Sequence, residues 1–257
     1  MTTTPNTQLY PAGNLYINGL GLLWVSNTTL TVSIGQARDI TNTNDIVNSA
    51  ALTLNMAANG ANGLDTGTIA ASTLYYVWIV GDSTDYSTTC CLASLSATAP
   101  ALPAAYDMQR RIGAIFSNGS SHIALFWQQG AESQGAGTNS SSRWMIYDAP
   151  IATGITAGAA TTYTAVNLEK TVPATASIVK IEIALTAGTA FDAVYLQPYG
   201  GTGAAAVFSS AVTGTASLGI VDVPVGVNAT PLPDLKYKVS SAGDAVALDV
   251  QGYIDEL

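Results

Sequence analysis

The sequence is poor in charge and in the side chains that carry most enzymatic catalysis. Charged residues make up 10% of the 257 positions, against roughly 25% in an average globular domain. There is one histidine, His122, and the two cysteines, Cys90 and Cys91, are adjacent. The polar positions are filled by Thr, Ser, Asn and Gly, which form hydrogen bonds but do not readily exchange protons at neutral pH. We therefore expect no enzyme, no cofactor and no catalytic residues, but a protein that is built into an assembly or binds a partner.

Basic residues are too few and too scattered to line a nucleic-acid groove. Eight Lys and Arg oppose 17 Asp and Glu, which gives a formal net charge of −9. Phosphate binding needs clustered positive charge, and the longest basic run is the pair Arg110–Arg111. No run reaches the ~18 uninterrupted apolar residues of a membrane span, and the first residues do not resemble a secretory signal. We expect no nucleic acid and no membrane as partners, and synthesis in the cytoplasm.

Helical periodicity is scarce, and a rhythm of short strands takes its place. Runs of β-branched and aromatic residues are broken by Gly, Asn, Pro and Ser about every eight to twelve residues, which is typical of sandwiches and barrels. The alternation is clearest in residues 177–185, where Lys180 and Glu182 face one way and the apolar residues between them face the other. The fold class is predicted to be all-β.

A stretch without aromatic or branched aliphatic residues divides the chain. Residues 131–142 read Ala-Glu-Ser-Gln-Gly-Ala-Gly-Thr-Asn-Ser-Ser-Ser, and because they cannot pack a core they are predicted to be a linker. They separate residues 14–130 from residues 143–257, and each part has a normal size for one domain. The expected architecture is two β-sandwich, jelly-roll-like domains joined by a Gly/Ser-rich linker.

The first 13 residues have no core of their own and are predicted to form an N-terminal arm. A segment of this kind gains order on contact with a partner. The arm is therefore the candidate anchor to a larger particle, with four candidate contact residues: Pro5, Leu9, Tyr10 and Pro11.

Adjacent aromatic residues in expected strands are the candidates for an oligomer interface. Tyr75–Tyr76 and Phe126–Trp127 must each send one ring to either face of a strand, because neighbouring side chains alternate. A large apolar surface with so little charge is hazardous on a monomer. An interface between subunits is therefore favoured over a sugar-stacking platform, which stays the alternative.

One segment gathers oxygen-bearing side chains at the spacing of cation ligands. Asp39, Asn42, Asn44 and Asp45 fall within seven residues, but the glycine and the terminal glutamate of an EF-hand loop are missing. A turn built from Asx hydrogen bonds, with Arg38 and Asp39 paired, is the favoured interpretation. The sequence leaves calcium binding at these four residues open, and no metal site is predicted elsewhere.

Five segments of the first part of the chain together resemble a module of tailed bacteriophages. Such modules occur in proteins described as tail-fibre-like or virion structural proteins, and the resemblance covers roughly residues 14–130. It implies exposure on the virion, assembly from subunits made in the host bacterial cytoplasm, and a homotrimer. Its motifs are structural, so it implies no active site. The segments are Asn18–Trp24, Gly35–Asp45, Asn59–Gly67, Leu74–Trp78 and Tyr106–Gly113.

The resemblance leaves the position on the virion open. A long tail fibre is expected to have a shaft, and neither sustained heptads nor a short repeat marks one here. A capsid-decorating or head-fibre protein is therefore favoured over a short tail fibre or receptor-binding protein that attaches to the host surface. A carbohydrate-binding module is the third interpretation. The expected partners are further copies of this chain and other virion proteins of the capsid or tail, with a host-surface glycan left open.

Overall fold

The computed structural model describes residues 16–129, 142–227 and 233–257. Every regular element within those ranges is a β-strand, which confirms the prediction of an all-β protein. The described residues contain no helix long and apolar enough to cross a membrane. The strands are β1 (Ile17–Gly19), β2 (Leu22–Trp24), β3 (Thr29–Val32), β4 (Gly35–Arg38), β5 (Asp45–Asn48), β6 (Leu52–Asn59), β7 (Gly63–Leu64), β8 (Thr73–Gly81), β9 (Thr89–Ser94), β10 (Met108–Ser117), β11 (Phe126–Gln129), β12 (Ser142–Gly158), β13 (Thr164–Asn167), β14 (Ala176–Thr186), β15 (Ala193–Pro198), β16 (Ala206–Ser209), β17 (Ser217–Pro224), β18 (Gly226–Val227), β19 (Pro233–Val239) and β20 (Ala245–Glu256).

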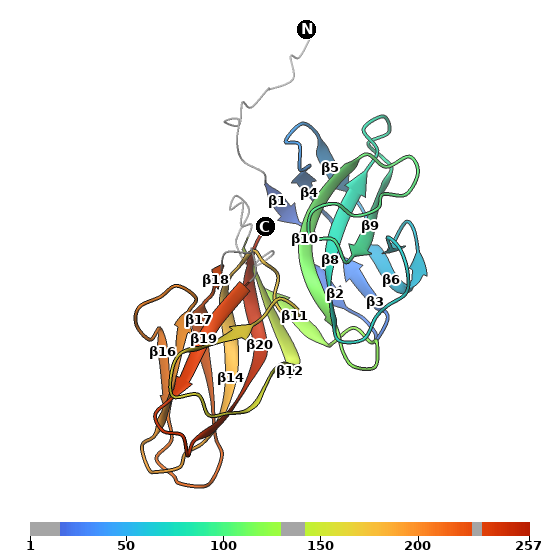
Figure 1. Ribbon diagram of the computed structural model, residues 1–257. Helices are drawn as coiled ribbons and strands as arrows, with labels where there is room; N and C mark the ends of the chain where they lie inside the picture. The colour runs from blue at the N-terminus through green and yellow to red at the C-terminus, as the bar shows by residue number, and fades with distance from the viewer. Residues whose placement is uncertain (1–15, 130–141, 228–232) are drawn as a thin grey trace.

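The first part of the chain forms two sheets, drawn blue to green in Figure 1. The larger has the order β10-β8-β9-β7-β6-β3-β2, and the smaller has the order β1-β4-β5. Strand β8 is buried on both faces, because Val77 and Ile79 belong to the main core whereas Trp78 and Val80 belong to a second, smaller cluster. This double burial explains why residues 74–80 are a nearly continuous apolar run.

The second part forms two further sheets, drawn yellow to red in Figure 1. One has the order β11-β12-β20-β14-β17, and the other has the order β13-β19-β15-β16 with β18 also paired to β19. Strand β14 alternates as its sequence predicts: Ile181 and Ile183 are fully buried, whereas Lys180 and Glu182 are partly exposed. The buried residues of both sheets belong to one core cluster.

The two parts of the chain share a sheet and a core. Strand β11, which precedes the predicted linker, pairs with β12, which follows it, in the register Phe126↔Tyr147 to Gln129↔Trp144. The main core cluster contains residues from β1 in the first part and from β20 in the second. Hydrogen bonds and apolar packing therefore cross the predicted domain boundary. The predicted arm, and the predicted linker apart from Ser142, lie outside the described residues.

Both cysteines lie in β9 and both are buried, as free thiols. Burial raises the pKa of the Cys90 thiol and raises that of Cys91 to about 12. Because the thiolate is the reactive form, such thiols are inert at neutral pH.

We predict that an aromatic disulfide reagent at pH 8 modifies no thiol in the folded protein and two thiols in guanidinium chloride. A Thr84→Cys variant, which places a thiol in an exposed loop, serves as the control and should react at one position without denaturant. Rapid reaction of a native cysteine in the folded protein would show that β9 is not packed as described.

Candidate functional site

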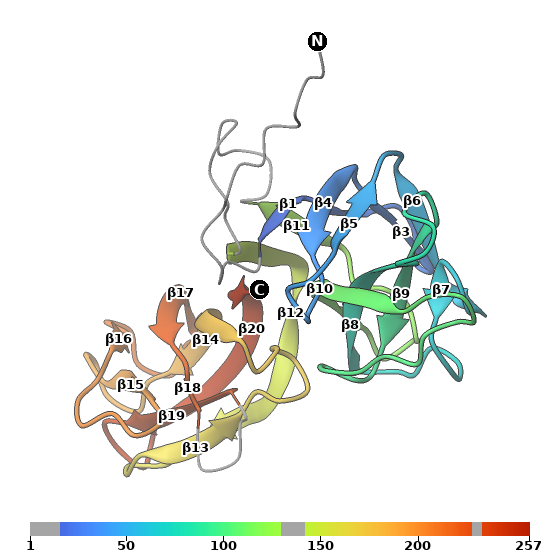
Figure 2. The same cartoon turned by 90° about the horizontal axis from the view of Figure 1, so that it is seen from above.

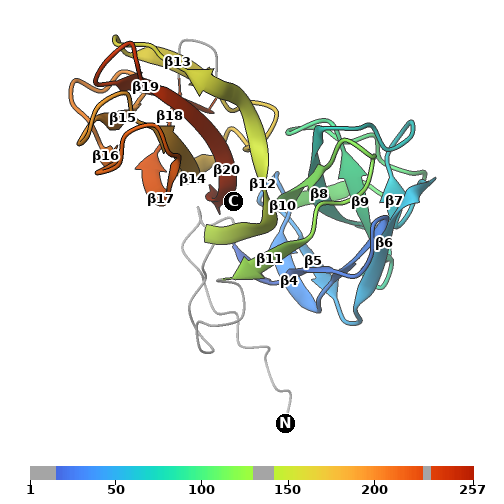
Figure 3. The ribbon, with the colours of Figure 1, turned by 90° about the horizontal axis from the view of Figure 1, so that it is seen from below.

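We call strands β1–β10, which form the first two sheets, the first lobe, and strands β11–β20, which form the other two, the second lobe. The most distinctive site among the described residues is the joint between these lobes. We use "joint" for the region where β10 and β2 of the first lobe meet β11, β12 and β20. Figures 2 and 3 show β12 between β20 and β10 at the centre of the molecule. Side chains and backbone groups from both lobes meet there in polar contacts, most of which are partly buried.

A buried ion pair lies at the centre of the joint. The Arg111 guanidinium is 3.2 Å from Oδ1 of Asp255, whose side chain is fully buried. Arg111 also donates to Oγ1 of Thr175 at 2.5 Å, and the Thr175 hydroxyl donates to the same Asp255 oxygen. The guanidinium lies 5.7 Å from the centre of the Tyr76 ring, within range of a cation–π contact. Four groups from β8, β10, β20 and the loop before β14 are therefore connected.

Burial has the largest effect on the pKa of the Asp255 carboxyl in this pair. It raises the pKa of the Asp255 carboxyl, while Arg111 and Thr175 oppose the rise by stabilising the carboxylate. A charge out of water is costly unless its partner stays in place. While the lobes are packed together, the ionised form of Asp255 therefore depends on Arg111, and removal of either charge would leave the other one buried without its partner.

Three further hydrogen bonds connect the lobes around the ion pair. The Tyr253 hydroxyl donates to the Ala114 carbonyl at 2.9 Å, and both groups are buried. The Arg143 guanidinium donates to the Gly19 carbonyl at 2.8 Å. The Leu22 backbone N–H donates to Oε1 of Gln128 at 2.7 Å. Each bond joins a backbone group of the first lobe to a side chain of β11, β12 or β20.

Aromatic rings fill the space between these polar contacts. The rings of Phe116 and Tyr147 meet edge to face at 6.5 Å, and those of Tyr147 and Tyr253 are 6.2 Å apart. Burial raises the pKa of both tyrosine hydroxyls well above the ordinary value. These phenols are therefore neutral at physiological pH and add no charge to the joint.

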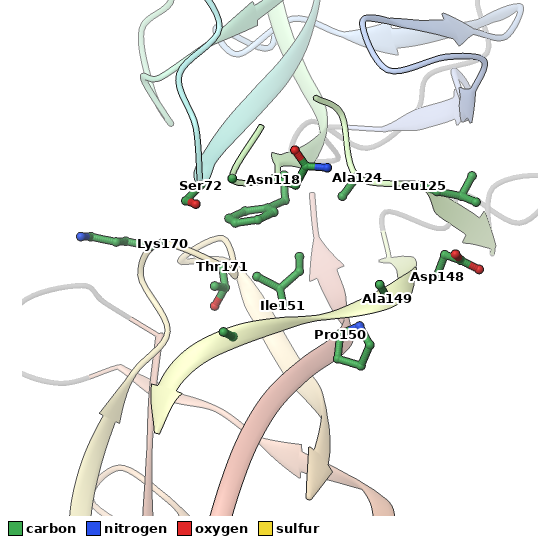
Figure 4. Close-up of a pocket in the computed structure, with 13 residues that line it drawn as sticks. Ser72, Asn118, Ala124, Leu125, Asp148, Ala149, Pro150, Ile151, Lys170 and Thr171 are labelled. Carbon is green, nitrogen blue, oxygen red and sulfur yellow. The ribbon is translucent and has the colours of Figure 1, made fainter. Parts of the chain in front are cut away.

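A cavity of about 400 Å³ opens beside the joint. Figure 4 shows Asn118 and Ile151 on opposite sides of it, with Lys170 at one end and Asp148 at the other. The described residues that line it include one carboxylate, that of Asp148, and one amine, that of Lys170, and these two groups do not form an ion pair. They include no histidine and no cysteine.

The structure corrects the predicted oligomer interface at two of its four residues. Tyr75 and Phe126 are each only 2% exposed and belong to the main core, so their rings cannot reach a second subunit. Tyr76 is partly buried beneath Arg111 in the joint. Trp127 is 50% exposed and is the one of the four that presents its ring to solvent. The predicted anchor residues Pro5, Leu9, Tyr10 and Pro11 lie outside the described residues.

The proposed calcium ligands are held in a turn. Both carboxylate oxygens of Asp39 accept hydrogen bonds, Oδ1 from the backbone N–H groups of Thr43 and Asn44 and Oδ2 from the Thr41 hydroxyl. Burial opposes the ionisation of Asp39, but these bonds outweigh it and lower the pKa of the carboxyl.

Asp45 is engaged elsewhere in the same turn. It pairs with Arg38 at 3.1 Å, so the predicted pairing of Arg38 with Asp39 is wrong. Within the described ranges, no group of three or more His, Cys, Asp or Glu side chains is placed to hold a metal ion.

Sequence reasoning missed the residues that make the joint. In the sequence, Arg111 stands out only as half of the longest basic run. No motif or spacing marks Asp255 or Arg143 as a residue that joins two parts of the chain. Arg111 and Asp255 are 144 positions apart, and no local pattern connects residues at such a separation.

Comparison with known proteins does not assign the chain. No family model matches the sequence, and no curated protein matches it. Among solved structures, SGBP-B from a complex xyloglucan utilization locus in Bacteroides uniformis aligns over 96% of this chain and 75% of its own, at 9% identity and a TM-score of 0.19. A TM-score of that size does not establish a shared fold.

We predict that Asp255→Asn lowers the free energy of unfolding by about 3–5 kcal/mol, because it leaves a mostly buried guanidinium without its counter-ion. The matched control is Asp222→Asn, which breaks the partly exposed Lys180–Asp222 pair and should cost about 1 kcal/mol or less. Urea unfolding followed by tryptophan fluorescence measures both. Equal effects of the two substitutions would contradict a central role for the joint.

Proposed function

We propose that this chain is a non-enzymatic structural protein on the exterior of a tailed-phage virion, and that it acts there as a homotrimeric capsid-decorating or head-fibre protein. The joint is the observation that carries the proposal. A subunit that projects from a particle must hold its outer part in a constant position, and a shared sheet with a buried ion pair removes the hinge that two separate domains would have. The resemblance of residues 14–130 to a tailed-phage module supports the same class.

Exposed apolar side chains support assembly with further copies of the chain. Leu23 in β2 is 53% exposed and Trp127 in β11 is 50% exposed, and these two strands are neighbours, joined by the bond from Leu22 to Gln128. Large exposed apolar residues close together mark interaction sites on soluble proteins. We propose that this region, together with Val25, lies between subunits.

A short tail fibre or receptor-binding protein is the alternative role. One observation favours it: the second lobe has a partly exposed face of lysines and tyrosines that suits a surface ligand. A carbohydrate-binding module is the second alternative. All three roles use a non-catalytic β scaffold, and they differ in where the protein is located and what it contacts.

Imaging of the intact virion tests the proposal directly. We expect gold-labelled antibody against the chain to decorate the head, and virions without the protein to keep adsorbing to host cells. Label confined to the tail, with loss of adsorption in virions that lack the protein, would establish the tail-fibre alternative. Absence of the protein from purified virions would refute both roles.

We predict that the purified protein sediments as a trimer at micromolar concentration and that Trp127→Ser shifts it toward monomer. Loss of a large apolar contact at the centre of an interface typically weakens association strongly. The control is Leu218→Ser, which removes another exposed apolar side chain, 71% exposed on β17, and should leave the trimer intact. A monomeric wild-type protein would contradict the proposed assembly.

We further predict that deletion of residues 1–13 leaves a folded, soluble oligomer that no longer joins the virion, since this arm is the proposed anchor. The measurement is the amount of the shortened protein in purified particles, with its circular dichroism spectrum as the control for folding. Normal incorporation of the shortened protein would place the anchor elsewhere.

A further inference from the structure

One face of the second lobe carries two lysines with no described carboxylate within 4.0 Å, although the buried Asp234 lies on the same side of their strand. It is the outer face of the sheet β13-β19-β15-β16, whose inner face contributes Leu235, Tyr237 and Leu196 to the core. Alternation along β19 places Lys236 and Lys238 on the opposite, outer side. We call this outer surface the lysine–tyrosine face and define it by five residues: Tyr163, Tyr195, Tyr199, Lys236 and Lys238.

The tyrosine rings hold both ammonium groups in place. The Lys238 Nζ lies 5.0 Å from the ring centre of Tyr163 and 5.0 Å from that of Tyr195, so it sits between two aromatic rings. The Lys236 Nζ lies 4.6 Å from the ring centre of Tyr199. Contacts of this kind restrict a long side chain that would otherwise sample many rotamers. The two charges are two residues apart on one strand, about 7 Å along it.

Neither lysine has an anionic partner in the part of the chain that the structure describes. Among those residues, no carboxylate lies within 4.0 Å of Lys236 or Lys238. Lys180 provides the contrast, because it lies 5.2 Å from the Trp144 ring centre and is also paired with Asp222 at 2.7 Å. Arg110 and Lys170 also have no described carboxylate within 4.0 Å. Lys236 and Lys238 differ from them in being neighbours on one strand whose ammonium groups both lie over tyrosine rings.

Apolar surface continues beside the lysines. Tyr195 pairs across the sheet with Val207 of β16, which is 55% exposed, and Tyr199 is 39% exposed. The face therefore offers aromatic and aliphatic surface together with two fixed positive charges. A complementary ligand presents flat, partly apolar rings and negative groups at intervals.

We propose that the lysine–tyrosine face binds an acidic polysaccharide, whose sugar rings pack against Tyr163, Tyr195 and Tyr199 and whose carboxylates or sulfates pair with Lys236 and Lys238. Sugars pack their C–H faces on aromatic rings, and exposed ammonium groups attract anions over about one Debye length. Nucleic acid fits less well, because its dense phosphates need a wide field of basic residues, and this chain has a net charge of −9. The proposal goes beyond a structural role and does not depend on the protein's position on a virion.

Affinity electrophoresis of the full chain in gels that contain a polysaccharide tests the proposal. Polygalacturonate supplies carboxylates, heparin supplies sulfates, and dextran is the neutral reference. We expect retardation by one or both acidic polymers, none by dextran, and weaker retardation as salt is added. Retention by the carboxylate polymer alone or by the sulfate polymer alone identifies the anionic group.

Matched variants locate the binding surface. The double variant Lys236→Ala/Lys238→Ala should lower affinity by about tenfold or more, and Tyr195→Ala should lower it severalfold. Lys236→Arg/Lys238→Arg keeps both charges and should retain binding. Lys180→Ala is the control, since it removes one stacked lysine whose charge is already paired, and it should change affinity less than about twofold. An unchanged thermal transition of each variant confirms that it is folded.

Several results would overturn the proposal. These are no retardation by either acidic polymer, equal retardation by dextran, unchanged binding in the double alanine variant, or tighter binding of a single-stranded oligonucleotide. None of them bears on the virion assignment, which the imaging experiment tests separately.

Discussion

The ion pair between Arg111 and Asp255 is the interaction on which the arrangement of the two lobes depends. A carboxylate that is fully buried and a guanidinium that is nearly so are stabilising only while they stay together. The Thr175 hydroxyl and the Tyr76 ring hold the guanidinium in position, and the shared sheet of β11 and β12 aligns the strands around it. Separation of the lobes would break this pair and expose the apolar residues of the core cluster that both lobes share, so we expect the molecule to behave as one body.

The strand pattern was predictable from the sequence because it is local. Alternation in β14 and the buried apolar run in β8 follow from nearest-neighbour side chains, and the structure shows both. The aromatic pairs show where local reasoning ends. The alternation of side chains along a strand predicts that Tyr75 and Tyr76 point to opposite faces of the sheet. It does not predict that Tyr75 enters the core or that Tyr76 lies beneath Arg111.

The joint could not be predicted for a different reason. Arg111 and Asp255 meet only after the two lobes have folded and docked. Neither residue belongs to a local pattern of charges that would predict a partner for it. The same holds for the lysine–tyrosine face, where Tyr163, Tyr195 and Lys238 come from three separate segments of the chain. Local alternation predicts that Lys236 and Lys238 point to the same, outer side of β19, and the structure confirms this. It does not predict which tyrosines from other strands lie beside them.

Distance measurement between the lobes tests the central claim, that the joint makes the chain rigid. Spin labels at Thr84→Cys in the first lobe and Thr215→Cys in the second are attached to exposed loops, and the buried native cysteines should stay unlabelled. Labelled chains are diluted with unlabelled ones so that only distances within one chain contribute. A rigid joint predicts a single narrow distribution in double electron–electron resonance. A broad or multiple distribution for the native sequence would mean that the lobes move independently and that the joint does not hold them in place.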